Sequence, residues 1–186
     1  MDHRHRPTSR RSLHSPQDVA APTHFEWTRQ PGIGPGLAIL GELRGQAIVE
    51  VGCGGGHNLA HLVYHHDATG IGVDHDAQKI TRARRAYSHL PRIRFILADA
   101  VDHLVSTQPA SIDICLSIFG AFSFADPTSL FTAASRAIRP GGLLAMTLRA
   151  DDHHDSVIVL RRRRYKYWGH HVPALRHRRR THTLPR

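Results

Sequence analysis

The chain has 186 residues, 40% of them hydrophobic, which is enough for one folded domain with a buried core. Its two cysteines, Cys53 and Cys115, are too few for a disulfide-stabilised secreted scaffold, and no apolar run approaches the roughly 18 residues of a membrane span. The formal net charge of +10 is concentrated in residues 151 to 186, which hold ten Lys and Arg against three Asp.

Residues 1 to 30 precede the first regular element, and we predict a largely flexible segment. Ser9-Arg10-Arg11-Ser12-Leu13 resembles a twin-arginine export signal, but no apolar stretch follows it, so we expect a cytoplasmic protein. Within this segment Trp27 is interpreted as a packing residue or as part of a cover over a ligand pocket. A loop at 31 to 36 then leads into a helix expected over 37 to 43.

The most informative stretch is an apolar strand over Ala47 to Val51 that runs into Gly52, Gly54 and Gly56. Glycines directly after a buried strand let the backbone turn sharply and approach a ligand. A helix from His57 to His66 would direct its free amide groups into the same crevice. A dinucleotide fingerprint would need its third glycine at position 57, so the spacing argues against a pyrophosphate clamp.

The next two strands also end in residues suited to contact a ligand. A second strand over residues 68 to 73 ends in Asp74, close to the spacing at which an acid meets ribose hydroxyls. An amphipathic helix over 76 to 89 precedes a third strand over 94 to 98, which runs into Asp99. Asp99 has two compatible interpretations: it contacts a ligand, or it caps the helix over 100 to 105.

A fourth strand over 112 to 118 leads into three closely spaced phenylalanines, Phe119, Phe122 and Phe124, which form either a ligand wall or ordinary core. Asp126 and Pro127 begin a helix that runs to about residue 138. The sequence Arg139-Pro140-Gly141-Gly142 ends it before a fifth strand over 143 to 148. Strands that alternate with helices predict an α/β fold, a Rossmann-like, doubly wound parallel sheet of about five strands.

The pattern Glu50-x-Gly52-x-Gly54-x-Gly56, with acids after the second and third strands, resembles the class I S-adenosylmethionine-dependent methyltransferases, and small bacterial enzymes acting on small molecules most of all. The resemblance covers about residues 35 to 149. It implies that S-adenosyl-L-methionine is the cofactor and that a methyl group passes to a small-molecule acceptor by in-line attack on the sulfonium. It also implies that the N-terminal segment covers the acceptor pocket, and that the cofactor is bound by Glu50, Gly52, Cys53, Gly54, Gly56, Asp74, His75, Asp99, Ala100 and Ser117.

The chain departs from the family after residue 150, where no clear antiparallel strand pair is visible. We therefore expect domain boundaries at 1 to 30, 31 to 150 and 151 to 186, the last a basic, largely disordered tail. Either the chain is a shortened variant or its reading frame changes near residue 150. An exposed edge of the fifth strand would then favour self-association.

Three alternatives remain open at this stage. The basic tail is of a kind that binds nucleic acid through phosphate contacts, although an unselected terminus is favoured. A shortened sheet is also compatible with a cofactor-binding pseudoenzyme. The histidine pairs at 65–66, 153–154 and 170–171 suggest a metal site, but no carboxylate or cysteine stands at ligand spacing, so we expect none.

Overall fold

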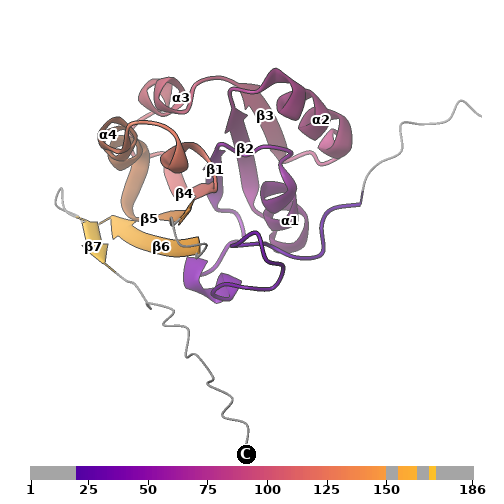
Figure 1. Ribbon diagram of the computed structural model, residues 1–186, viewed down its shortest axis with the longest axis horizontal. Coiled ribbons are helices and arrows are strands. Elements are labelled where there is room, and N and C mark those ends of the chain that lie inside the picture. Colours follow the sequence, from indigo (N-terminus) through magenta and orange to yellow (C-terminus); the bar gives the residue numbers. More distant parts are fainter. Residues whose placement is uncertain (1–19, 150–154, 163–167, 171–186) are drawn as a thin grey trace, which may run out of the picture.

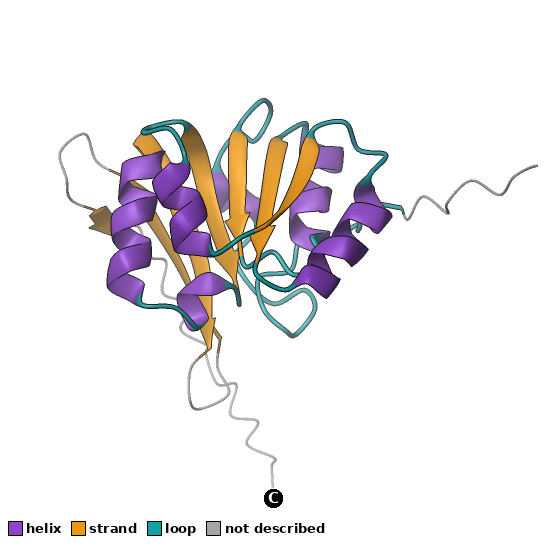
Figure 2. Ribbon diagram, turned by 90° about the horizontal axis from the view of Figure 1, so that it is seen from above, coloured by secondary structure: helices purple, strands orange, loops and turns teal. Residues whose placement is uncertain are grey.

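The computed structural model describes residues 20–149, 155–162 and 168–170. These form one seven-stranded sheet in the order β3-β2-β1-β4-β5-β6-β7, flanked by helices on both faces (Figures 1 and 2). The chain order of the elements is η1 (Leu37–Leu40), β1 (Ala47–Val51), α1 (His57–His66), β2 (Thr69–Asp74), α2 (Ala77–Tyr87), β3 (Ile93–Leu97), α3 (Ala100–Ser106), β4 (Ile112–Ile118), η2 (Ala121–Ser123), α4 (Pro127–Ala137), β5 (Ile138–Arg149), β6 (Asp155–Arg162) and β7 (Trp168–His170).

The first five strands are all parallel, which confirms the predicted Rossmann-like sheet. β1 lies at its centre, with β2 on one side and β4 on the other. The chain therefore reverses its direction of travel across the sheet between β1 and β4. Open α/β sheets bind ligands at such a switch point, outside the carboxyl ends of the strands.

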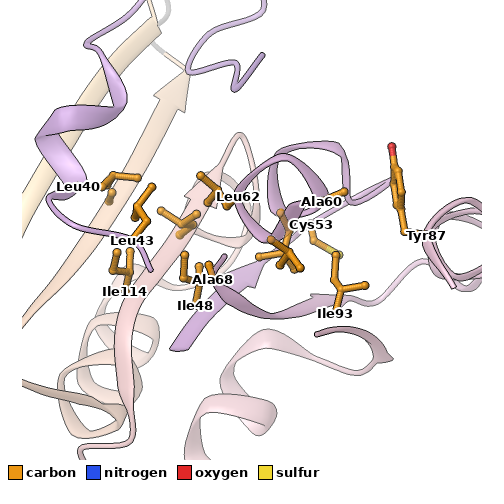
Figure 3. Close-up of a cluster of buried hydrophobic side chains, with 14 of the residues drawn as sticks. Leu40, Leu43, Ile48, Cys53, Ala60, Leu62, Ala68, Tyr87, Ile93 and Ile114 are labelled. Carbon is orange, nitrogen blue, oxygen red and sulfur yellow. The ribbon is translucent and has the colours of Figure 1, made fainter. Parts of the chain in front are cut away.

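Two hydrophobic clusters cover the two faces of the sheet. On one face, leucines of α1 and Ile80 of α2 belong to one cluster with Ile48 and Ile114, and residues just before β1 extend this cluster (Figure 3). On the other face, α3 and α4 pack over Val49, Val51 and Leu144. The side chains of successive β1 residues pack on opposite faces of the sheet because side chains alternate along a strand.

Aspartates define where three of the helices begin. Asp76 and Asp99 each accept hydrogen bonds from two backbone amides in the first turn of α2 and α3, and Asp126 accepts one from the first turn of α4. These bonds satisfy amides that have no partner inside the helix. At the other end of α4, Arg139-Pro140-Gly141-Gly142 forms an irregularity within β5, between the pairs Ile112–Ile138 and Ile114–Leu143.

The prediction that the sheet lacks antiparallel strands after the fifth is wrong. β6 runs antiparallel to β5 from Leu143–Arg161 to Arg149–Asp155, and β7 pairs in turn with β6. The apolar stretch of β6, Val157 to Leu160, is short and is followed by arginines. The sequence pattern therefore did not indicate a strand there. The edge of β5 is consequently covered by β6, and the sheet extends into the segment expected to be a disordered tail.

Part of the N-terminal segment, from residue 20 onward, lies within the described part of the chain. Residues 20 to 36 form no regular helix or strand, but Trp27 is only 3% exposed and belongs to the core, as its packing interpretation predicted. The Thr147 hydroxyl on β5 donates a 2.7 Å hydrogen bond to the Trp27 carbonyl. The expected helix over 37 to 43 is the single turn η1. Residues 1 to 19 lie outside the described part of the chain.

β6 contributes to the core, so shortening one of its buried side chains will destabilise the domain. Leu160 is 5% exposed and packs in the cluster beneath α4. We expect Leu160→Ala to lower the free energy of unfolding by about 2 to 4 kcal/mol. Urea denaturation measures this difference. Ser156→Ala, at an exposed position of the same strand, is the control, and a Leu160→Ala effect no larger than the control's would show that β6 does not belong to the folded core.

Candidate functional site

A hollow of about 570 Å³ lies at the switch point of the sheet, a volume typical of small-molecule sites. It is bounded by the loops that follow β1, β2, β3 and β4. Its walls comprise Gly52, Cys53, Gly54, Val73, Asp74, His75, Lys79, Ala98, Asp99, Ala100, Ile118, Phe119, Gly120, Ala121, Phe124 and Ala125. Seven of the ten residues implied by the family resemblance are among them.

The glycine loop after β1 is shaped by two kinds of glycine. A Cβ on Gly52 would lie 2.5 Å from the Gly120 Cα, and a Cβ on Gly120 would lie 2.3 Å from the Val51 carbonyl oxygen, so the loops after β1 and β4 meet without side chains between them. Gly54, with φ +55°, has no atom within 4 Å of its Cβ position, although it lines the hollow. Its backbone is thus exposed to whatever fills the hollow.

Asp74, at the end of β2, holds the glycine loop through a hydrogen bond to its backbone. Its side chain is 5% exposed, and its two carboxylate oxygens accept hydrogen bonds from the amides of Gly54 at 2.8 Å and Asp76 at 2.9 Å. Each oxygen of a carboxylate has a second lone pair, so Asp74 can still accept bonds from a ligand. His75 beside it is largely exposed.

Asp99 performs the capping role that was one of its two interpretations. One of its oxygens accepts the amides of Val101 at 2.8 Å and Asp102 at 3.1 Å. The residue is exposed and also lines the hollow, so capping leaves the other oxygen available on the ligand side.

Glu50 lies outside this hollow and lines a second one, of about 540 Å³. The side chain is 3% exposed, and no atom described in the structure pairs with its Oε2. Burial raises the pKa of Glu50 to about 8, the Leu59 amide opposes the shift, and the nearby charge of Asp74 adds to it. The carboxyl group is therefore protonated at neutral pH. Burial likewise raises the pKa of Cys53 and Cys115, so neither is a thiolate nucleophile.

The N-terminal segment forms the outer wall of the second hollow. Glu26 and Asn58 exchange two hydrogen bonds, of 3.0 Å and 2.9 Å, between the segment's backbone and the side-chain amide on α1. Beyond this clamp, His24, Arg29 and His57 line the hollow. Cys53, Ile118 and Phe119 line both hollows, which are therefore neighbours.

Phe119 lines both hollows and is therefore part of the partition between them, and its backbone is strained. Its φ of +49° lies in the left-handed region, which is unfavourable for a side chain of this size. Its amide is held by the Thr147 carbonyl at 3.2 Å. Of the three phenylalanines, Phe119 and Phe124 line hollows, whereas Phe122 is core and packs on Phe131.

Two residues implied by the resemblance line neither hollow. A Cβ on Gly56 would lie 2.3 Å from the Phe95 ring, so this glycine serves the packing of α1 against β3. Ser117 is buried, and its hydroxyl accepts the Phe122 amide at 3.2 Å, which holds η2 in place. Sequence reasoning missed Lys79 and Arg29, since surface helices and N-terminal loops carry many basic residues that have no role in a site.

The structure describes few of the residues named in the metal and tail hypotheses. Within its described ranges, no group of three or more His, Cys, Asp or Glu gathers as a metal site would require. No helix in the same ranges has the length and hydropathy needed to cross a bilayer. His153, His154, His171 and the arginines at 163–164 and 178–180 lie outside them.

Comparison with known proteins agrees with this geometry. Residues 49–146 match a family model described as a methyltransferase domain. O-methyltransferase cnsE of Penicillium expansum is 28% identical over 152 residues, which cover 79% of this chain and 52% of that protein. The ubiquinone biosynthesis O-methyltransferase of Idiomarina loihiensis is 31% identical over 100 residues, which cover 54% of this chain and 41% of that protein. The chain thus spans about half the length of these relatives.

The fold likewise matches solved structures. Geranyl diphosphate C-methyltransferase from Streptomyces coelicolor A3(2), in complex with Mg²⁺, geranyl diphosphate and S-adenosyl-L-homocysteine, aligns with a TM-score of 0.53 at 18% identity. The alignment covers 59% of this chain and 41% of that one. At this identity the likeness is one of fold.

The protonated state of Glu50 predicts a pH dependence of stability. Because its pKa in the folded protein lies above the ordinary 4.5, the unfolded chain ionises first as pH rises, and stability is lost between pH about 4.5 and about 8. We expect Glu50→Gln to remove this loss. Across that pH window the free energy of unfolding of the wild type should therefore fall by a few kcal/mol relative to that of the variant. Urea unfolding of both proteins at pH 5, 6.5 and 8 measures the difference, and a constant difference would contradict a buried, neutral Glu50.

Proposed function

The chain belongs to the class I S-adenosylmethionine-dependent methyltransferase family, and from this membership we propose that it transfers a methyl group from S-adenosylmethionine to a hydroxyl oxygen of a small molecule. The observation that carries the proposal is the open backbone of Gly54 above Asp74, at the switch point of the sheet. A hydroxyl is chosen because the two curated relatives compared above are named O-methyltransferases.

The residues present fit the cofactor. Gly54 lines the first hollow and a Cβ there would meet no protein atom, so its backbone is open to a bound group. Asp74 supplies lone pairs suited to ribose hydroxyls, and Asp99 supplies an oxygen suited to the adenine amino group. Glu50 lines the second hollow, which shares Cys53 with the first, so its unpaired Oε2 suits an ammonium group if the cofactor's amino-acid end extends from the first hollow into the second.

When bound, the cofactor supplies a methyl group already activated by its sulfonium, so the protein needs mainly to orient the acceptor and exclude water. The second hollow is the proposed acceptor site, and Phe119 lies where it adjoins the first. His24 and His57 line this second hollow, and either imidazole can take the hydroxyl proton as the new O–C bond forms and the S–C bond to the departing thioether breaks.

A methyl group added at Gly54 will block cofactor binding. Gly45 provides a matched control, because its φ of +71° is also left-handed, its Cβ position is also free of neighbours, and it lines neither hollow. Both alanine variants should lose about 1 kcal/mol of stability from backbone strain. Only Gly54→Ala should bind S-adenosylhomocysteine at least about tenfold more weakly by calorimetry. Equal affinities for the two variants would place the cofactor elsewhere.

Removing the Asp74 carboxylate should weaken the cofactor site in two ways, by freeing the glycine loop and by removing ribose acceptors. We expect Asp74→Ala to lower S-adenosylhomocysteine affinity by about 30-fold or more. Wild type should also form S-adenosylhomocysteine from labelled S-adenosylmethionine only when a hydroxylated acceptor is added. Unchanged binding by the variant, or product formation that does not depend on an acceptor, would contradict the proposed function.

A further inference from the structure

A third, small hollow lies beside the partition residue Phe119 and is lined by Arg29, Phe119, Ser123 and Phe124. Its volume of about 90 Å³ corresponds to about three water molecules, so it holds one small chemical group and not a whole acceptor. Arg29 and Phe119 also line the second hollow, and Phe119 and Phe124 also line the first. The small hollow therefore adjoins both larger hollows, in which acceptor and cofactor would lie.

The Arg29 guanidinium is held in position from two sides. On β6, Asp155 accepts bonds from the Arg29 amide at 3.3 Å and from its guanidinium at 3.4 Å. The guanidinium carbon also lies 5.5 Å from the centre of the Phe119 ring, a cation–π distance. In Figure 1 the N-terminal segment and β6 lie at the same side of the molecule. Asp155 uses one of the five guanidinium N–H groups, and half of the Arg29 side chain remains exposed.

Ser123 provides a second, independent indication of a ligand. Its hydroxyl oxygen is buried, and no described atom of the protein forms a hydrogen bond with it. Buried hydroxyls are rarely left unpaired because the loss of hydration is costly. Phe124 next to it is 82% exposed, which is unusual for a large aromatic ring. A guanidinium, an unpaired hydroxyl and two aromatic rings thus surround a space that no carboxylate lines.

We propose that this small hollow, hereafter the anion subsite, binds a carboxylate carried by a planar aromatic acceptor. The inference rests on the proposed function, because it assigns the substrate class of the same acceptor site. In the subsite Arg29 donates to the carboxylate in a charge-assisted pair, the Ser123 hydroxyl donates a further bond, and the rings of Phe119 and Phe124 contact the aromatic plane. Asp155 is a positioning residue that orients Arg29.

The test compares two probes that differ in charge, 3,4-dihydroxybenzoate and its methyl ester. Binding of each is measured by calorimetry to the full chain saturated with S-adenosylhomocysteine. Wild type should bind the acid at least about tenfold more tightly than the ester. Arg29→Met should abolish that preference, whereas Arg29→Lys should keep part of it. Ser123→Ala should weaken binding of the acid about threefold and leave the ester unchanged.

Arg44→Met is the matched control. Arg44 is also paired with an aspartate, Asp67, but lines none of the three hollows, so the preference should persist. Affinity for S-adenosylhomocysteine is measured first on every variant, and its retention shows that the fold is intact. Failure of wild type to bind it would overturn the proposed function. Intact cofactor binding with equal binding of the two probes, with binding of neither, or with the preference kept in Arg29→Met would overturn the anion subsite alone.

Discussion

The contact between Gly52 and Gly120 is the constraint on which the site depends. It joins the loops that follow β1 and β4, the two strands between which the sheet reverses its order. A side chain at either position would meet backbone at less than 3 Å, and backbone atoms cannot move aside as a flexible side chain can. The close approach sets where Phe119 lies, and Phe119 is common to all three hollows.

Two neighbouring carboxyl groups show how environment assigns different chemistry to the same side-chain type. Asp74 accepts hydrogen bonds from two backbone amides, one on each of its oxygens. Glu50 is buried with one oxygen unpaired, and burial raises its pKa to about 8, so it is a neutral acid at pH 7. A bound cation would reverse this preference, because an adjacent positive charge favours the ionised form. Glu50 is therefore a carboxyl group that a cationic ligand can ionise.

The acceptor side is assembled from parts of the chain that are distant in sequence. The N-terminal segment is clamped to α1 through Asn58, to β5 through Thr147 and to β6 through Asp155. The first two contacts are ordinary hydrogen bonds, and the third includes an ion pair between Arg29 and Asp155. Together they hold a segment without regular secondary structure against the sheet. The strand β6 has two roles as a result: it covers the edge of β5 and it orients Arg29.

The amino-acid sequence by itself determined the five parallel strands, the helices between them and the glycine loop, because hydrophobic periodicity, capping aspartates and glycine spacing are local signals. It also brought Asp74 and Asp99 to one hollow, since parallel strands place their carboxyl ends at one edge. Only the tertiary structure decided that Ser117 and Gly56 serve packing, that Glu50 faces the second hollow, and that Arg29, Ser123 and Asp155 gather. Those outcomes depend on pairing between residues as far as 126 positions apart, and neither periodicity nor composition records such pairing.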